Sequence, residues 1–370
     1  MADGTKIEWT DATWNPITGC AVVSPGCTNC YAMKLAGTRL KHIPSRTGLT
    51  RDTKAGPVWT GEIRFNAEWL DQPLRWHRPR MIFVCAHGDL FAEGVTDEML
   101  DQVFAVMALA PQHTFQVLTK RPDRMRDYCR RVDERGRHPS MNAAAALAAT
   151  GCWNTPALDL RVWPLPNVWL GVSAEDQRRA DERIPALLDT PAAVRWVSAE
   201  PMLGPIDFTS ISLGEKAGVV LGEDGEPDRP ETFRVDRNAL QDCDGAFERI
   251  DWIVVGGESG HGARPMHPDW ARAIRDQCAK AEVPFLFKQW GEWGLAAPRP
   301  SGMPGDLALA TAPPYTDSCP PMVVQIDHYP RQIDLFGGAS VLERVGKKAA
   351  GRLLDGVQHD GYPPAEEILF

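Results

Sequence analysis

Short apolar runs alternate with helical patterns along most of the chain. Six of these runs are rich in β-branched and aromatic residues, as expected for parallel strands that are covered on both faces. They span residues 81–86, 114–119, 168–172, 195–198, 252–255 and 284–287. Between them, apolar residues recur every four positions, as at Met99, Val103 and Met107 after the capping residue Thr96. The alternation predicts an α/β fold, which an open doubly wound sheet or a barrel would satisfy equally.

Polar and charged residues follow each of the six runs almost at once. They are His87, Asp89, Lys120, Arg121, Ser173, Glu175, Glu200, Glu258, Ser259, Lys288 and Gln289. In a β/α barrel the carboxyl ends of the strands converge on one site, so six successive polar ends favour the barrel over the open sheet. The sequence therefore predicts a partial (β/α) TIM-like barrel of about six parallel strands.

Two long intervals and a changed C-terminal composition predict how the chain is organised. We assign residues 1–296 to the barrel, with surface insertions near residues 129–163 and 208–250, where Gly, Pro, Ala and acidic residues gather. Prolines are frequent from residue 298 to residue 321. Residues 297–370 are therefore predicted to form a proline-rich linker and a C-terminal helical extension, with a helix near residues 347–354.

Composition narrows the class of protein. Of the 370 residues, 43% are hydrophobic and 24% are charged, which is ordinary for a globular protein. No stretch approaches the roughly 20 uninterrupted apolar residues of a membrane span, and the N-terminal residues lack the apolar core of a secretory signal. We expect a cytoplasmic protein without a membrane partner.

Charge is unevenly distributed along the chain. Residues 34–80 contain ten Lys or Arg and four Asp or Glu, a net charge of +6, so the remainder carries −15 of the total of −9. A basic segment of this kind can meet an anionic partner, which predicts a nucleic acid or nucleotide substrate. A solvated surface loop with charged side chains is the alternative.

Three of the nine cysteines are crowded into eleven residues, while the other six are scattered singly and form no disulfide framework. Cys20, Cys27 and Cys30 have the spacing C-x6-C-x2-C, and Gly19 and Gly26 let the chain turn tightly between them. Three thiolates can hold three irons of a [4Fe–4S] cluster and leave the fourth iron open.

Two alternatives remain for these cysteines. His42 lies twelve residues beyond Cys30 and could complete a Cys3His zinc site. The protein would then be a zinc-stabilised nucleic-acid-binding protein without catalysis. The other alternative is three unrelated buried cysteines, which the loop of Pro and Gly residues around them disfavours.

The cysteine motif and seven further segments resemble a known family. The segments are residues 11–16 (DATWNP), 88–91 (GDLF), 118–122 (LTKRP), 198–201 (SAEP), 256–260 (GGESG), 288–293 (KQWGEW) and 346–356 (GKKAAGRLLDG). Together they resemble the phage-associated three-Cys-motif family. The cysteines resemble a stretched form of the radical S-adenosylmethionine signature, and their Cys-x-x-Cys-Tyr ending is similar to that of spore photoproduct lyase.

The resemblance implies reductive cleavage of S-adenosylmethionine to methionine and a 5′-deoxyadenosyl radical. The cluster would receive its electron from a donor such as flavodoxin or ferredoxin. S-adenosylmethionine would lie across the strand ends. Its ribose would bond to Ser173 and Glu175, and its amino group and adenine would contact Glu200, Gly256, Gly257, Glu258 and Ser259.

Lys120, Lys288 and Cys85, at the strand ends, are the candidate catalytic residues. Lys120, Arg121 and Lys288 suit an anionic substrate, or they form ion pairs with the nearby glutamates across the barrel mouth. Cys85 ends a strand and can act as a hydrogen-atom donor, or it is a small buried hydrophobe. The two tryptophans of the 288–293 segment can stack on a nucleobase or belong to the core.

Overall fold

The structure, a computed structural model, centres on one parallel sheet of seven strands. It describes residues 4–5, 7–149, 162–221, 227–242, 248–298, 300–310, 323–328, 330 and 339–364. The strands of the sheet, in spatial order, are β1 (Ala12–Trp14), β6 (Met81–Val84), β7 (Thr114–Thr119), β8 (Val168–Ser173), β9 (Val194–Ala199), β12 (Trp252–Gly256) and β13 (Phe285–Gln289).

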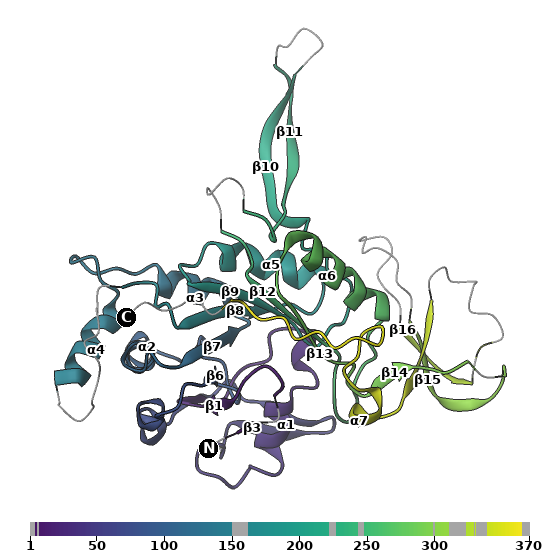
Figure 1. Cartoon of the computed structure of the whole chain (residues 1–370), viewed down its shortest axis with the longest axis horizontal. Helices are drawn as coiled ribbons and strands as arrows, with labels where there is room; N and C mark the ends of the chain where they lie inside the picture. Colours follow the sequence, from purple (N-terminus) through teal and green to yellow (C-terminus); the bar gives the residue numbers. More distant parts are fainter. Residues whose placement is uncertain are drawn as a thin grey trace.

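Every neighbouring pair in this sheet is parallel, and the spatial order follows the order along the chain. Figure 1 shows a curled half-barrel with α5 and α6 lying along the sheet. The helices that follow the strands are α1 (Tyr31–Gly37), α2 (Asp97–Leu109), α3 (Pro122–Cys129), α5 (Gln177–Leu188) and α6 (Pro268–Ala281). The prediction of an α/β fold is confirmed. The strand missing from the predicted six is β1, whose three residues are too few to show as an apolar run.

The main core lies between the sheet and these helices. The predicted period of α2 is borne out at Val103 and Met107, which are fully buried, while Met99 at the start of the helix is partly buried. Thr96 caps the helix as expected, its hydroxyl oxygen accepting a hydrogen bond from the Met99 amide at 3.4 Å. Amphipathic helices of this kind hold the strands at fixed positions, and so fix where the strand ends lie.

Large aromatic side chains fill the other, concave face of the sheet. Trp9 meets Phe83 edge-on at 4.7 Å and Trp196 at 5.2 Å, and Trp252 lies 5.2 Å from Trp196. Gly171 lies against this cluster, where a Cβ atom would come within 2.5 Å of the Trp196 indole. The aromatic cluster therefore closes the half-barrel below the strand ends, and the close packing requires glycine on β8.

The C-terminal segment covers the open edge of the sheet at β13. Phe287 donates its amide to the His359 carbonyl at 3.0 Å, and Gly361 donates to the Phe285 carbonyl at 2.9 Å. Tyr362 then stacks on Trp252 at 5.3 Å. The C-terminal segment thus protects β13 from edge-to-edge pairing, and Tyr362 covers the aromatic cluster at Trp252.

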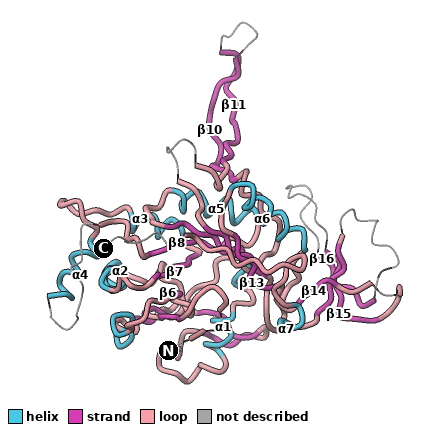
Figure 2. Tube along the Cα trace, viewed as in Figure 1, coloured by secondary structure: helices cyan, strands magenta, loops and turns pink. Residues whose placement is uncertain are grey.

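Additional elements extend from the half-barrel, as Figure 2 shows by secondary structure. Two of them fall in the predicted insertions: α4 (Pro139–Ala149), and a long hairpin of β10 (Ile211–Leu221) and β11 (Pro227–Arg237) that projects from the body. Parts of both insertions lie outside the described residues. Two small antiparallel sheets follow β1: β2 (Ile17–Thr18) pairs with β5 (Arg64–Phe65), and β3 (Thr50–Thr53) forms a hairpin with β4 (Gly56–Trp59).

The C-terminal region contains more sheet than the proline content suggested. An antiparallel sheet has the order β14 (Trp293–Leu295), β17 (Ser340–Arg344), β15 (Pro304–Ala310) and β16 (Val323–His328). The following helix, α7 (Lys347–Ala350), is shorter than the predicted helix over 347–354. Residue Gly351, at a φ of 72°, ends it early. None of the helices in the described ranges is both long and apolar enough to cross a membrane.

The close contact at Gly171 makes a direct prediction about packing. Gly171→Ala should lower the free energy of unfolding by about 1–3 kcal/mol, because the added methyl group overlaps the rigid Trp196 ring. Urea denaturation followed by tryptophan fluorescence measures the change. Gly294→Ala is the matched control, since its Cβ would meet no atom nearer than 3.4 Å. Equal stability of the two variants would contradict this description of the concave face.

Candidate functional site

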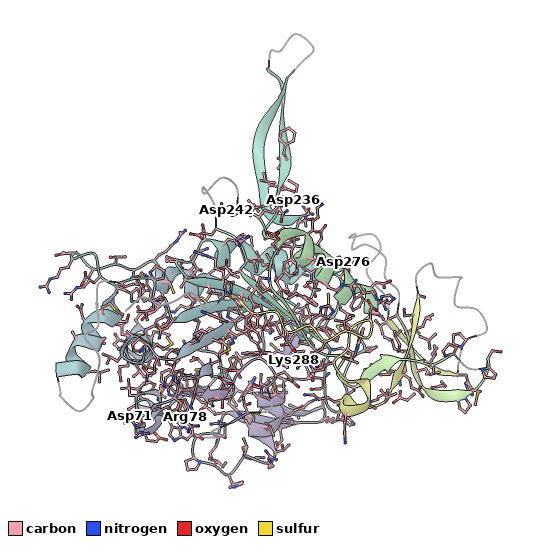
Figure 3. All side chains as sticks on the ribbon, in the orientation of Figure 1. Asp71, Arg78, Asp236, Asp242, Asp276 and Lys288 are labelled. Carbon is pink, nitrogen blue, oxygen red and sulfur yellow. The ribbon has the colours of Figure 1, made fainter. Side chains whose placement is uncertain are left out.

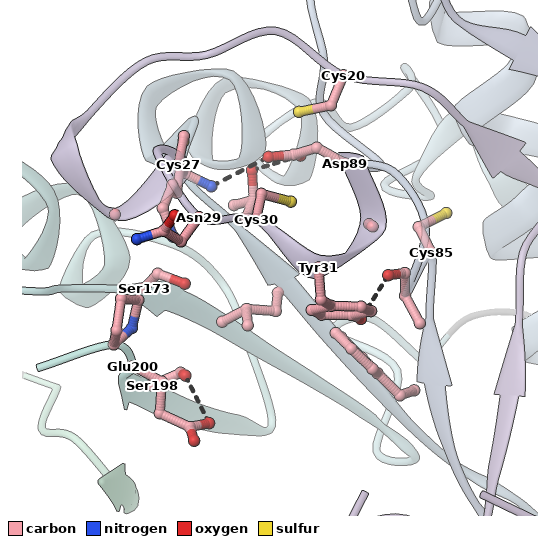
Figure 4. Close-up of a pocket in the computed structure, with 18 of the residues that line it drawn as sticks. Cys20, Cys27, Asn29, Cys30, Tyr31, Cys85, Asp89, Ser173, Ser198 and Glu200 are labelled. Atoms are coloured by element: carbon pink, nitrogen blue, oxygen red, sulfur yellow. Dashed lines mark hydrogen bonds between the residues drawn. The ribbon is translucent and has the colours of Figure 1, made fainter. Parts of the chain in front are cut away.

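One cavity of about 260 Å³ lies at the carboxyl ends of the parallel strands. Figure 4 shows the three cysteines of the 20–30 segment on one side of it and residues of β8 and β9 on the other. The predicted site residues that line the cavity are Cys20, Cys27, Cys30, Cys85, Lys120, Arg121, Ser173, Glu200, Gly257, Glu258, Ser259 and Lys288. Residues far apart in the sequence are thus brought to one place, as the barrel prediction required.

The three cysteines lie on one tightly turned loop, residues 19–30, which we call the cysteine loop. The Cys27 amide donates to the Ser24 carbonyl at 2.9 Å, and the Cys30 amide donates to the Cys27 carbonyl at 3.2 Å. Burial, together with the charge of Asp89 and against the opposing effect of Arg121, raises the pKa of the Cys20 thiol to about 12. Burial also raises the pKa of the Cys30 thiol, so without a metal both of these groups favour the neutral form.

The metal alternatives make different demands on these thiols. Within the described ranges no three His, Cys, Asp or Glu side chains converge as they do around a single metal ion. In a [4Fe–4S] cluster each thiolate binds a different iron, so the sulfurs must face one cavity rather than one point, and Cys20, Cys27 and Cys30 do line one cavity. His42, the fourth ligand of the zinc alternative, is exposed and lies outside the residues that line it.

Arg121 anchors the beginning of the cysteine loop to the end of β7. Its Nη1 donates to Cys20 Sγ at 3.3 Å and to Asp89 Oδ2 at 3.0 Å, and its Nη2 donates to the Ala21 carbonyl at 3.2 Å. The remaining donors bind Glu93 at 3.1 Å. The cysteine loop, Asp89 and Glu93 therefore occupy the donor groups of Arg121, which leaves none for a substrate.

Glu175 anchors the middle of the loop to the end of β8. The carboxylate is fully buried, does not line the cavity, and accepts a hydrogen bond from the Gly26 amide at 3.2 Å. Its counter-ion is Arg183 of α5, at 2.9 Å. Burial by itself would raise the pKa of Glu175, but the charges of Lys120 and Arg183 outweigh burial and lower it. Glu175 is thus ionised, and it bonds the loop directly.

Glu258 anchors the end of the loop to the end of β12. It accepts a hydrogen bond from Asn29 Nδ2 at 2.9 Å and forms a two-pronged ion pair with Arg264, at 2.7 and 2.9 Å. Arg264 also donates to the Pro25 carbonyl at 3.0 Å. Burial opposes ionisation, yet the hydrogen bonds from Arg264 hold the pKa of Glu258 below its usual value. The third strand end therefore contacts the loop at two points.

Glu200 and Lys288 form the ion pair that was expected across the mouth of the barrel. Lys288 Nζ lies 3.1 Å from Glu200 Oε1 and 6.0 Å from the centre of the Trp9 ring, and Figure 3 places Lys288 near the middle of the molecule. Ser198 donates its hydroxyl to Glu200 at 3.3 Å. Both charged groups line the cavity, but each already has an opposite charge beside it.

Lys120 differs from Arg121 and Lys288. It lines the cavity, and it forms no ion pair or side-chain hydrogen bond with any residue that the structure describes. The charged residues that line the cavity are Lys120, Arg121 and Lys288 against Asp89, Glu200 and Glu258. Their formal charges balance, and Lys120 is the cation among them that has no carboxylate within ion-pair distance in the described residues.

Gly256, the last residue of β12, and Gly257 allow close approach of neighbouring groups to the backbone. A Cβ at Gly256 would lie 2.4 Å from Glu200 Oε1, and one at Gly257 would lie 2.0 Å from the Trp290 carbonyl. Gly257 lines the cavity, whereas Gly256 does not. Gly256 therefore makes room for the Glu200 carboxylate. Gly257 lies at the cavity, but its amide donates to the Gln289 carbonyl at 2.9 Å.

Cys85 lies at the end of β6 with an unusual backbone. It is 2% exposed, lines the cavity and has a φ of 58°, which is rare for a residue with a side chain. Burial raises the pKa of its thiol, so the group remains protonated. The two tryptophans after β13, in contrast, are core residues: Trp290 is bonded to the Leu353 carbonyl at 2.9 Å and Trp293 to the Ala263 carbonyl at 2.7 Å. The stacking role suggested for them is wrong.

Sequence reasoning missed the partners that hold the loop. Arg183, Arg264 and Asn29 were not singled out, although Asn29 lies inside the cysteine motif. Arg264 follows the GGESG segment by four residues, and its spacing from Glu258 gives no periodic signal. Arg183 of α5 lies eight residues after Glu175 and pairs with it. The sequence alone does not show in which direction Arg183 points from its helix.

The buried pair of Glu175 and Arg183 yields a testable prediction. Arg183→Met should lower the free energy of unfolding by about 3–5 kcal/mol at pH 7, because it leaves a buried carboxylate without a counter-ion. Arg178→Met on the same helix is the control. Its pair with Glu182 is 68% and 46% exposed, so the loss should stay below about 1 kcal/mol.

The pH dependence follows from the lowered pKa of Glu175. The ion pair contributes fully to the free energy of unfolding above the usual pKa of a glutamate. This contribution disappears as the pH falls through the lowered pKa of Glu175 in the folded state. The difference between the parent protein and Arg183→Met should therefore shrink below about pH 4. Urea titrations at several pH values test this, and a difference that grows towards low pH would contradict it.

Comparison with known proteins identifies a family but no activity. A family model described as "Protein of unknown function (DUF5131)" matches residues 4–363. No curated protein and no solved structure matches the chain. The matched segment includes the cysteine loop and every strand end that lines the cavity. The chain therefore belongs to the DUF5131 family.

Proposed function

We propose that this protein is a radical S-adenosylmethionine enzyme that holds a [4Fe–4S] cluster on Cys20, Cys27 and Cys30. The observation that carries the proposal is the position of these cysteines. All three line one cavity at the carboxyl ends of a parallel half-barrel. The sequence resemblance to radical enzymes supports the same assignment independently of this geometry.

The cysteine loop is suited to holding a cluster with one iron free of protein ligands. Three thiolates can bind three irons, and Cys85, the remaining cysteine of the cavity, lies on a different strand end. When bound, such a cluster supplies an electron for the reductive cleavage of S-adenosylmethionine. The residues of the chain bind, orient and shield the reactants around it.

Two cations lie in the same cavity as the cysteines that would hold an anionic cluster. Three thiolates and an oxidised [4Fe–4S] core carry roughly one net negative charge. Lys120 lines the cavity, and Arg121 donates a hydrogen bond directly to Cys20 Sγ at 3.3 Å. Hydrogen bonds to the sulfur ligands are among the factors that set the reduction potential of a cluster. Arg121 is therefore assigned a positioning role rather than contact with a substrate.

Polar groups opposite the cysteine loop are available for S-adenosylmethionine. Ser173 and Ser259 line the cavity beside the Glu200–Lys288 pair. Their hydroxyl groups can bond a ribose, an amino group or an adenine. Glu175 and Glu258 contribute differently from the role first expected for them, since their carboxylates hold the cysteine loop.

The cluster is tested by its metal content. Protein prepared without oxygen should be brown and contain about four irons and four sulfides per chain. Replacing any one of the three cysteines by alanine should remove most of the iron, whereas Cys129→Ala, at a buried cysteine of α3, should leave it unchanged. Colourless protein with one zinc per chain, lost on His42→Ala, would instead support the zinc-stabilised alternative.

The ligand site is tested separately from the cluster. Ser173→Ala should weaken S-adenosylmethionine binding about fivefold to tenfold with the iron content unchanged, because one hydrogen bond is lost. Glu258→Ala should instead lower the iron content, because the end of the cysteine loop loses its bonds to Asn29 and Arg264. Equilibrium binding and iron analysis on the same samples separate the two effects. An unchanged iron content in Glu258→Ala would contradict the anchoring role.

A further inference from the structure

A buried arginine without a counter-ion lies in the segment between α1 and β3. Arg46 is only 6% exposed, and no carboxylate of the described residues lies within ion-pair distance of its guanidinium. Burial by itself lowers the pKa of Arg46, with no acidic group acting against it. A buried charge that nothing neutralises is strongly destabilising. The position therefore fits an anion that the described part of the chain does not itself supply.

One edge of this guanidinium has no protein partner. Nη1 of Arg46 donates to the Ser45 carbonyl at 3.1 Å and to the Ser45 hydroxyl at 2.9 Å. Nε is buried without a partner, and Nη2 forms no hydrogen bond with the described residues. Nε and Nη2 lie side by side on the guanidinium, the arrangement that donates two parallel hydrogen bonds to the oxygens of one carboxylate or phosphate group.

The groups around the guanidinium are neutral. The centre of the Trp69 ring lies 5.9 Å from the guanidinium carbon, close to the outer limit of a cation–π contact at about 6 Å. Burial, together with the charge of Arg46, lowers the pKa of His87 to about 4, so the imidazole is uncharged at physiological pH. Its Nδ1 is also buried without a partner among the described residues. An uncompensated positive charge and unpaired polar atoms thus lie close together.

The residues around Arg46 are tied to the start of the cysteine loop. Thr18 donates its hydroxyl to the Ser45 carbonyl at 2.8 Å, and the Gly19 amide donates to the His87 carbonyl at 3.2 Å. Both contacts are made by the two residues that immediately precede Cys20. The supports of the guanidinium are therefore also the supports of the chain that leads into the cysteine loop.

We infer that Arg46 is the centre of an oxyanion-binding site that takes a phosphate or carboxylate group, with Nε and Nη2 donating to two of its oxygens. Neither Arg46 nor His87 lines the cavity, so the site is separate from the one assigned to the cluster and does not rest on the proposed function. Other cations of the 34–80 segment already have partners: Lys41 pairs with Asp52 at 2.7 Å, and Arg64 donates to two backbone carbonyls.

The test is isothermal titration calorimetry of the full chain, prepared without oxygen, with inorganic phosphate and with acetate as probes. Arg46→Met should weaken binding of the better probe at least tenfold, because the charge and both donors are lost. Arg46→Lys keeps the charge but not the paired donors, and should weaken binding about threefold to fivefold. Arg51→Met removes the same charge from an exposed position of β3 and should leave the affinity unchanged.

Thermal unfolding separates a binding site from an arginine that only braces the fold. In buffer without phosphate, Arg46→Met should unfold about 1–3 °C above the parent protein, because an uncompensated buried charge is removed. Saturating phosphate should raise the unfolding temperature of the parent protein and leave that of Arg46→Met unchanged. The inference is overturned if Arg46→Met unfolds below the parent protein, or if the parent protein binds neither probe at concentrations up to about 10 mM.

A nucleoside monophosphate as a third probe identifies the source of the oxyanion. Affinity at least tenfold above that of inorganic phosphate, lost in Arg46→Met, supports a phosphorylated organic ligand, whereas equal affinity supports the free ion. Nucleotide binding that Arg46→Met does not weaken overturns the inference. Iron content, measured on the same samples, keeps the two proposals apart. Protein that holds the cluster but binds no oxyanion contradicts this inference alone, and protein that binds the oxyanion but holds no iron contradicts the proposed function alone.

Discussion

The structure around the cavity depends on how the cysteine loop is fastened to the sheet. Three strand ends hold it, through Arg121 after β7, Glu175 after β8 and Glu258 after β12. Each anchor is a charged group that is buried or nearly so and has its own counter-ion. A buried charge without a partner is strongly destabilising, so the loop and its anchors must form together. The loop itself has little apolar surface that could hold it in place.

This arrangement separates two kinds of charged residue that look alike in the sequence. The glutamates at 175 and 258 use their carboxylates to position backbone and side-chain atoms of the loop. Lys120, next to Arg121 in sequence, lines the cavity with no carboxylate of the described residues within ion-pair distance, and its charge acts on Glu175 from further away. The aromatic cluster on the concave face of the sheet packs below these charged residues and fills the interior of the half-barrel. Only the strand ends are then open to ligands, which is why the polar residues concentrate there.

Much of the fold could be predicted because parallel strands have a strong signature. Buried strands such as β8 read as continuous apolar runs, and the polar residues after them revealed the common edge. Strand β1 was missed because it has three residues, and the C-terminal sheet was missed because prolines surround its strands. Its strand β15 is nonetheless buried over Leu307–Ala310, which long-range pairing with β17 stabilises rather than local sequence preference.

The sequence predicted many of the residues that line the cavity, but it did not predict which of them pair with one another. The cysteines, Ser173, Lys120 and Lys288 were found because residue type and strand position both indicate them. Pairing was not predictable, because the choice of Arg183 over Lys120 as the partner of Glu175 depends on the facing of α5. Likewise, the burial of Arg46 and the exposure of Tyr31 follow from how α1 and the β3–β4 hairpin pack.

The central claim is that the cysteine loop holds a four-iron cluster with one iron open to a ligand. Electron paramagnetic resonance of the reduced protein, with and without S-adenosylmethionine, tests it most directly. The predicted result is the signal of a reduced [4Fe–4S] cluster whose g-values shift when S-adenosylmethionine is added, because the ligand binds the open iron. A missing signal, or two identical spectra, would contradict the claim.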